Sequence, residues 1–262
     1  MIKKLVSLLW LLLFATQAQA ALVPTQLLSI SSSADGTSYT PGTTFNIQSN
    51  TLLIAMIQVD YGSTPSVLSA VALTGACSHS FTNTGLGVSI GSSHRVMTWY
   101  ATSGSSGTGC SITMTSGASE TLTGWSIKLV ERTDALVTGT NGSGGINFTN
   151  ALVASNANTT STTITFTSLL SSGNALMTCG ASKLNATTVT AEWTEIGVEV
   201  SHGLANATFG CQYTIGGADL TGTLTYGATG ANLANGIEIR EDTSVPSSGS
   251  ANKYFMLTGV GE

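Results

Sequence analysis

The ten residues TLLIAMIQVD (51–60) decide the fold class of this 262-residue chain. From Leu52 to Ile57 six apolar residues follow one another without a break, and Val59 extends the run. A strand with one solvated face alternates apolar and polar residues, whereas a strand covered on both faces is apolar almost throughout. The stretch therefore predicts a strand that is buried on both faces, or one at the centre of a sandwich.

Short strand-like segments recur after this run, and glycine-rich turns separate them. Apolar residues do not recur at helical spacing beyond the first twenty positions, so no helix is predicted there. The pattern predicts an all-β fold, an antiparallel two-sheet β-sandwich of the jelly-roll type. The further expected strands lie at 66–75, 94–102, 110–116, 125–134, 161–170, 174–182, 190–201, 207–216, 220–228 and 235–242.

The order of these strands is compatible with an internal duplication. In the first half HRVMTWYAT (94–102) is followed by CSITMTSG (110–117) and then by WSIKLVERTD (125–134). In the second half ATFGCQYT (207–214) precedes LTGTLTYGA (220–228) and NGIEIRED (235–242). The expected organisation is a signal peptide at 1–20, a β-sandwich domain at 21–245 with candidate halves at 21–138 and 151–245, and a linker and tail at 246–262.

The first twenty residues have the composition of a secretory signal peptide. Lys3 and Lys4 precede an apolar run that is too short to span a bilayer, and Ala18-Gln19-Ala20 offers a cleavage site. No later segment has eighteen unbroken apolar residues, so no membrane span is predicted after cleavage. The expected location is secreted or extracellular, with periplasm or virion as alternatives.

The charge balance excludes two classes of partner. Without the two leader lysines the chain has six basic and 13 acidic residues, a formal charge of −7. Nucleic acids and anionic membranes both require a basic surface, so neither is an expected partner. Charged residues make up only 8% of the chain, which leaves Ser, Thr, Gly and Asn to form the surface.

All four cysteines lie beyond the leader, at Cys77, Cys110, Cys179 and Cys211. An even number in a secreted chain predicts two disulfides, although four cysteines allow three pairings. The pairing of neighbours would close two loops of similar length. When the two candidate halves are aligned strand by strand, however, Cys110 and Cys211 fall on different strands. The similar distance of each from its preceding cysteine therefore does not mark equivalent positions.

Aromatic and acidic side chains supply the candidate binding residues. Trp99 and Trp125 are expected in the core, because each belongs to an apolar strand. Trp193 has polar neighbours and is expected to be exposed. Candidate binding residues are Trp193, Tyr100, Glu195 and Glu199, the two glutamates sharing one face of a strand by the period of two.

Catalytic and metal signals are weak. GVSIG (87–91) matches the G-x-S-x-G pattern around Ser89, but it lacks the strand-to-helix context of a hydrolase elbow. The three histidines are not paired with an acid or a cysteine in sequence. Asp60 ends a strand and is the residue considered for calcium, although no calcium-loop motif surrounds it. No catalytic residue, metal site or required cofactor is predicted.

The strand series NTLLIAMIQVD, RVMTWYAT, GTGCSITMTSG and WSIKLVERTD resembles a β-sandwich pattern of secreted bacterial and bacteriophage structural proteins. The resemblance covers about residues 45–245 and rests on strand chemistry. It implies a jelly-roll or concanavalin-like sandwich with a structural or binding role, and it brings no catalytic residues. The leader and the cysteines depart from what a virion protein would show.

The sequence therefore predicts a secreted, non-catalytic protein for surface interaction through adhesion, glycan binding or assembly. Expected partners are a glycan or a protein surface, or further copies of the chain through its terminal strands. The alternatives are a phage or prophage virion component and a secreted carbohydrate-active hydrolase, which needs two carboxylates facing across a cleft.

Overall fold

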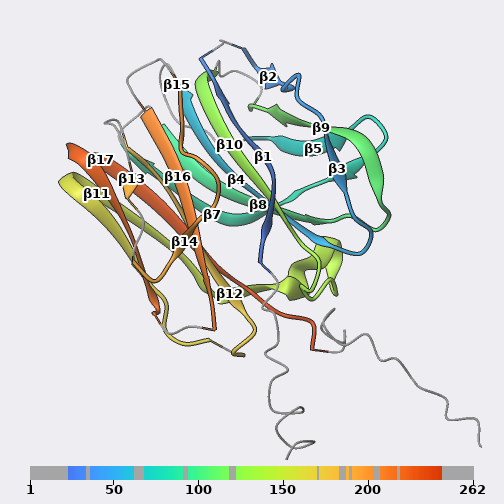
Figure 1. Ribbon diagram of the computed structural model, residues 1–262. Coiled ribbons are helices and arrows are strands. Elements are labelled where there is room, and N and C mark those ends of the chain that lie inside the picture. The colour runs from blue at the N-terminus through green and yellow to red at the C-terminus, as the bar shows by residue number, and fades with distance from the viewer. Residues whose placement is uncertain are drawn as a thin grey trace, which may run out of the picture.

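Antiparallel strands are the main regular elements of the described chain. The computed structural model describes residues 23–33, 36–61, 68–90, 94–117, 122–169, 171–182, 187–188, 191–202, 207–216 and 219–243. The expected signal peptide (1–20) and tail (246–262) lie outside these residues and stay predictions. Apart from the short 3-10 helix η1 (Thr140–Gly145), the described elements are strands that form three sheets (Figure 1). The prediction of an all-β, antiparallel fold is confirmed, whereas the expectation of two sheets is wrong, because the described strands form three.

The central sheet contains the apolar run at 51–60. Its strand order is β1 (Thr25–Ser32), β10 (Leu122–Arg132), β4 (Leu52–Tyr61), β8 (His94–Thr102) and β7 (Thr82–Ile90). β4 lies in the middle and pairs with β10 and β8 along its length. Every residue from Thr51 to Asp60 is buried, so the prediction of a strand covered on both faces is confirmed.

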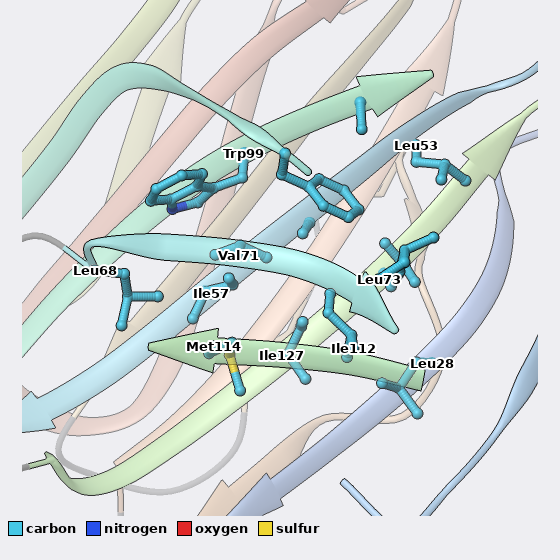
Figure 2. Close-up of a cluster of buried hydrophobic side chains, with 14 of the residues drawn as sticks. Leu28, Leu53, Ile57, Leu68, Val71, Leu73, Trp99, Ile112, Met114 and Ile127 are labelled. Atoms are coloured by element: carbon cyan, nitrogen blue, oxygen red, sulfur yellow. The ribbon is translucent and has the colours of Figure 1, made fainter. Parts of the chain in front are cut away.

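A small sheet covers one face of the central sheet. It consists of β2 (Ser38–Tyr39), β9 (Gly107–Thr115), β5 (Ala70–Thr74) and β6 (His79–Ser80), with β3 (Phe45–Ile47) also paired to β9. Figure 2 shows the core between the two sheets, where Leu53 and Ile57 of β4 contact side chains of β5 and β9. Alternate residues of β4 therefore fill this core and leave the intervening ones for the opposite face.

A large sheet covers that opposite face. Its order is β11 (Ile146–Thr165), β17 (Thr221–Ile239), β12 (Ala175–Ser182), β16 (Ala207–Ile215) and β14 (Thr194–Glu195), with β13 (Thr187–Thr188) on β17 and β15 (Val200–His202) on β16. A second core joins the two sheets, with Ile54 and Met56 of β4 packed among Met177, Phe209 and Ile237. β4 thus supplies both cores, which explains its continuous apolar sequence.

The paired strands β11 and β17 fold back over the large sheet. We call residues 159–165 of β11, residues 221–226 of β17 and β13 the outer flap. A Cβ at Gly236 would lie 2.6 Å from Ile164, and one at Gly180 would lie 2.5 Å from Leu224, so only glycine fits beneath the flap. A third core, which includes Phe166, Leu176 and Trp193, lies in this region.

The central and large sheets have the same strand order. With β13 and β15 set aside, each sheet has five strands in a row. Numbered by their place in the sequence, both rows run first, fifth, second, fourth, third. The outer strands correspond too: β9 pairs with β2 and β5, while residues 221–226 of β17 pair with β11 and β13.

Some expected strand boundaries differ from the structure. The strand expected at 190–201 is two short strands, β14 and β15, because the chain turns at Gly197, whose φ is +58°. Residues 220–228 and 235–242 were expected as two strands, yet 221–239 form the single strand β17. Both parts of β17 pair with β11, with register shifts on either side of Thr159, and sequence patterning does not reveal this shared partner.

Candidate functional site

The predicted aromatic residues are buried. Trp99 and Trp125 are 5% and 3% exposed, which confirms their expected place in the core. The expectation that Trp193 is exposed is wrong: it is 4% exposed and stacks on Phe166 with ring centroids 6.3 Å apart. The outer flap covers it, and its polar sequence neighbours point away from that core. Tyr100 is 5% exposed.

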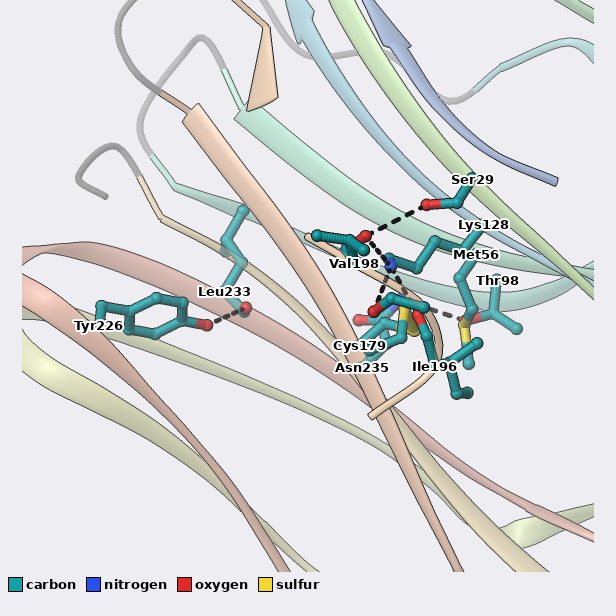
Figure 3. The surroundings of a disulfide bond; sticks show 12 residues. Ser29, Met56, Thr98, Lys128, Cys179, Ile196, Val198, Tyr226, Leu233 and Asn235 are labelled. Carbon is teal, nitrogen blue, oxygen red and sulfur yellow. Dashed lines mark hydrogen bonds between the residues drawn. A yellow bond between two sulfur atoms is a disulfide. The ribbon is translucent and has the colours of Figure 1, made fainter. Parts of the chain in front are cut away.

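Glu195 and Glu199 approach a buried lysine rather than share a strand face. Lys128 of β10 is fully buried, and its Nζ donates to the carbonyl oxygens of Ile196 at 2.6 Å and Val198 at 2.8 Å (Figure 3). Burial lowers the pKa of Lys128 to about 8, while Glu195 and Glu199 act in the opposite direction. The two carboxylates are therefore counter-charges of one ammonium group.

The loop that Lys128 binds also contacts β1. Ser29 Oγ donates to the Val198 carbonyl at 3.4 Å, and Ser31 Oγ donates to the Ser201 carbonyl at 2.7 Å. We call residues 196–201 the strap, because they tie the large sheet to β1 and β10 of the central sheet. Glu199 of the strap and Glu195, which precedes the strap, both interact with the Lys128 ammonium group.

The four cysteines form Cys77–Cys110 and Cys179–Cys211. The first joins the turn after β5 to β9, and the second joins directly paired residues of β12 and β16 in the core facing the central sheet (Figure 3). The two bonds occupy different strand positions, as the sequence alignment of the halves indicates. Two disulfides indicate an oxidising, extracytoplasmic environment.

Arg132 and Glu131 are buried ionic groups that form hydrogen bonds within the fold. Arg132 binds Asp134 through two nitrogens, at 2.7 and 3.1 Å, and donates to the carbonyls of Ile239 and Gly173. Glu131 accepts hydrogen bonds from the Gln48 backbone and the Thr51 hydroxyl. These partners fix the end of β10 against both neighbouring sheets.

Asp60 and His94 form a side-chain hydrogen bond that sequence spacing did not predict. The carboxylate of Asp60 contacts His94 Nδ1, and the Gln58 amide donates to Asp60 at 3.4 Å. The residues come together because Asp60 and His94 are directly paired on β4 and β8. Ser89 of the G-x-S-x-G match is paired with Arg95, and therefore lies on the opposite sheet face from His94.

An aromatic pair with polar neighbours lies where β7, β8, η1 and β11 meet. Phe148 is 45% exposed and its ring meets Tyr100 edge-on, with centroids 6.0 Å apart. Tyr100 is hydrogen-bonded to Thr82, whose Oγ1 also accepts from Asn141 Nδ2 at 2.9 Å. We call Thr82, Tyr100, Asn141 and Phe148 the rim site. Sequence reasoning identified Tyr100 and missed the other three.

A bulge in β11 turns Phe148 outward. Asn147 is paired with Glu238 and Leu152 with Gly236, so four residues of β11 stand opposite one residue of β17. Glu238, which is fully buried, accepts hydrogen bonds from the amides of Asn147, Asn150 and Asn174 at 2.6, 2.7 and 2.5 Å. Asn147 precedes the bulge and Asn150 lies within it, so the buried carboxylate fixes the shape of the bulge.

No group of three or more His, Cys, Asp and Glu side chains gathers as a metal site among the described residues. In the same part of the chain, no helix is long and apolar enough to cross a membrane. Comparison of the sequence with protein-family models and with curated proteins, and of the fold with solved structures, finds no match.

Proposed function

We propose that this chain is an extracytoplasmic, non-catalytic protein that binds neutral glycans at a surface. One observation carries the proposal: both outer layers present hydroxyl side chains in paired rows. On the outer flap Thr163 and Thr223 contact each other through their Oγ1 atoms at 3.0 Å. On the small sheet Thr40 contacts Thr113 at 2.6 Å, and Thr74 contacts Ser111 at 2.8 Å.

Hydroxyls both donate and accept hydrogen bonds, and they carry no charge. A surface built from them matches a neutral, hydroxyl-rich ligand and offers nothing specific to a polyanion. The hydrolase alternative needs two carboxylates facing across a cleft. Glu238 and Asp134 do not supply such a pair, because asparagine amides bind the first and Arg132 binds the second inside the fold.

For the architecture we propose two β-sandwich units of jelly-roll type, related by duplication and packed through the central and large sheets. The shared strand order of these sheets supports this proposal. In a crystal structure, strands β11, β12, β14, β16 and β17 should superpose on β1, β4, β7, β8 and β10 in that order. A second half that superposes only in another strand order would refute the duplication.

Binding is tested with the purified full chain and a panel of neutral polysaccharides: cellulose, chitin, mannan, starch and mixed-linkage β-glucan. We expect retention by at least one polymer that persists at high salt, since no ionic contact contributes. Retention that vanishes with salt, or no retention on any polymer, contradicts the proposal. Light scattering on the same sample reports whether copies associate, as the assembly alternative requires.

A further inference from the structure

We propose that the rim site binds a pyranose ring of the glycan, with Phe148 as the stacking platform and Asn141 as a hydrogen-bonding partner. The inference rests on the proposed function and names the site and the contact chemistry. A pyranose ring has C–H groups on its faces and hydroxyls around its edge, so it needs an aromatic surface beside neutral donors and acceptors. The rim site supplies both.

The local structure of β11 keeps the Phe148 side chain exposed. Fully burying a phenylalanine side chain contributes roughly 1.5–3 kcal/mol, so a ring that is 45% exposed forgoes part of that stabilisation. Hydrogen bonds fix the bulge that presents the Phe148 ring. Asn147 and Asn150 both donate to Glu238, and Asn150 Oδ1 accepts from the Thr167 hydroxyl. Bulges that re-aim a side chain are frequent beside functional sites.

Tyr100 supports the platform from below. Its ring meets Phe148 at an interplanar angle of 67°, the edge-to-face arrangement that aromatic pairs favour. Because Tyr100 is itself buried and hydrogen-bonded to Thr82, it limits movement of the Phe148 ring without competing for the ligand. A rigid aromatic surface loses little conformational entropy on binding.

Asn141 provides the polar side of the site. Its backbone has φ +53°, a left-handed conformation uncommon for a residue with a side chain, and the residue is exposed. Its Nδ2 is committed to Thr82 and to the Ser80 carbonyl, which orients the amide oxygen as an acceptor for a sugar hydroxyl. The rim-site side chains are uncharged, so a sugar can bind there without displacing water from a charged group of the protein.

The test uses the full chain and the polysaccharide that retains it most strongly. Phe148→Ala should weaken retention about tenfold, and Phe148→Trp should preserve it. Asn141→Gly should also weaken it while keeping the fold, since glycine accepts a positive φ. Val153→Ala is the matched control, because Val153 lies on the same strand and is 46% exposed. It should leave retention unchanged.

Thermal unfolding of each variant checks that the fold is intact. If Phe148→Ala is retained as strongly as the wild type and melts at the same temperature, the rim site is not the binding site. The proposed function would then still hold. Equal losses in Phe148→Ala and Val153→Ala also overturn it, because the contact would then be non-specific. Retention of the wild type by no polymer in the panel overturns the proposed function and this assignment together.

Discussion

Glu238 is a buried carboxylate whose hydrogen-bond partners are side-chain amides. It lies on β17 with no exposed surface, and three asparagines from β11 and from the residue before β12 direct their NH₂ groups at it. Burying a charge costs several kcal/mol unless hydrogen bonds replace its hydration. Asn147, Asn150 and Asn174 supply that replacement, so these residues act as one unit.

Glu238→Gln is expected to lower the free energy of unfolding by about 2–3 kcal/mol. The new NH₂ group would face an asparagine NH₂ group, and one buried donor would lose its acceptor. Urea unfolding at pH 7 measures the change. Glu192→Gln serves as the control, since Glu192 is exposed and its substitution should stay within about 0.5 kcal/mol. Equal effects of the two substitutions would show that the network contributes nothing particular.

At the scale of elements, the strap connects two sheets through one lysine. The pKa of Lys128 falls to about 8 from an ordinary 10.5, chiefly through burial. Between these values the native protein has released a proton that the unfolded chain still holds. The free energy of unfolding therefore rises with pH across this window, and the contribution is flat below it.

We expect a gain of about 2 kcal/mol between pH 8 and pH 10 from this group. Urea unfolding at pH 7.5, 8.5, 9.5 and 10 measures it, and Lys128→Met should remove the slope. The series stops at pH 10 because burial raises the pKa of Tyr226 above its ordinary 10.0, which reverses the trend at higher pH. The same slope in Lys128→Met would assign the effect to other groups.

Elements differ in how far the sequence predicts them. β4 and β8 are predictable because the apolar run and the alternation lie within single strands. Trp193 is not, because its cover comes from Phe166 and from the region of Gly222, each about thirty positions away. The exposure of Phe148 is not predictable either, because the stretch 139–150 has the composition of a glycine- and asparagine-rich loop. A bulge has no alternating pattern that would reveal it.

The whole molecule is organised around one strand, β4, which two cores share. The central and large sheets meet through Leu52, Ile54 and Met56 on one side and Met177, Phe209 and Ile237 on the other. β4 also forms the core with the small sheet. Because the two cores share this strand, neither half can lose its packing without exposing apolar surface of the other.

Calorimetry of the full chain is therefore expected to show one unfolding transition, with equal calorimetric and van't Hoff enthalpies. Ile112→Ala beneath the small sheet and Ile237→Ala in the second core should each shift that whole transition downward, by about 2–4 kcal/mol in stability. Two resolved transitions, of which each substitution moves only one, would mean that the halves unfold independently.

The position of β17 has a mechanical consequence. Near its end, Ile239 is paired with Ile146 of β11 on one side and with Ala175 of β12 on the other. Its hydrogen bonds lie across the strand, so a pull along the chain beyond Thr243 loads both ladders in shear, many bonds at once. β1, in contrast, pairs with β10 alone among the described strands. A molecule attached through its C-terminal end would therefore resist tension through a strand that is held on both sides.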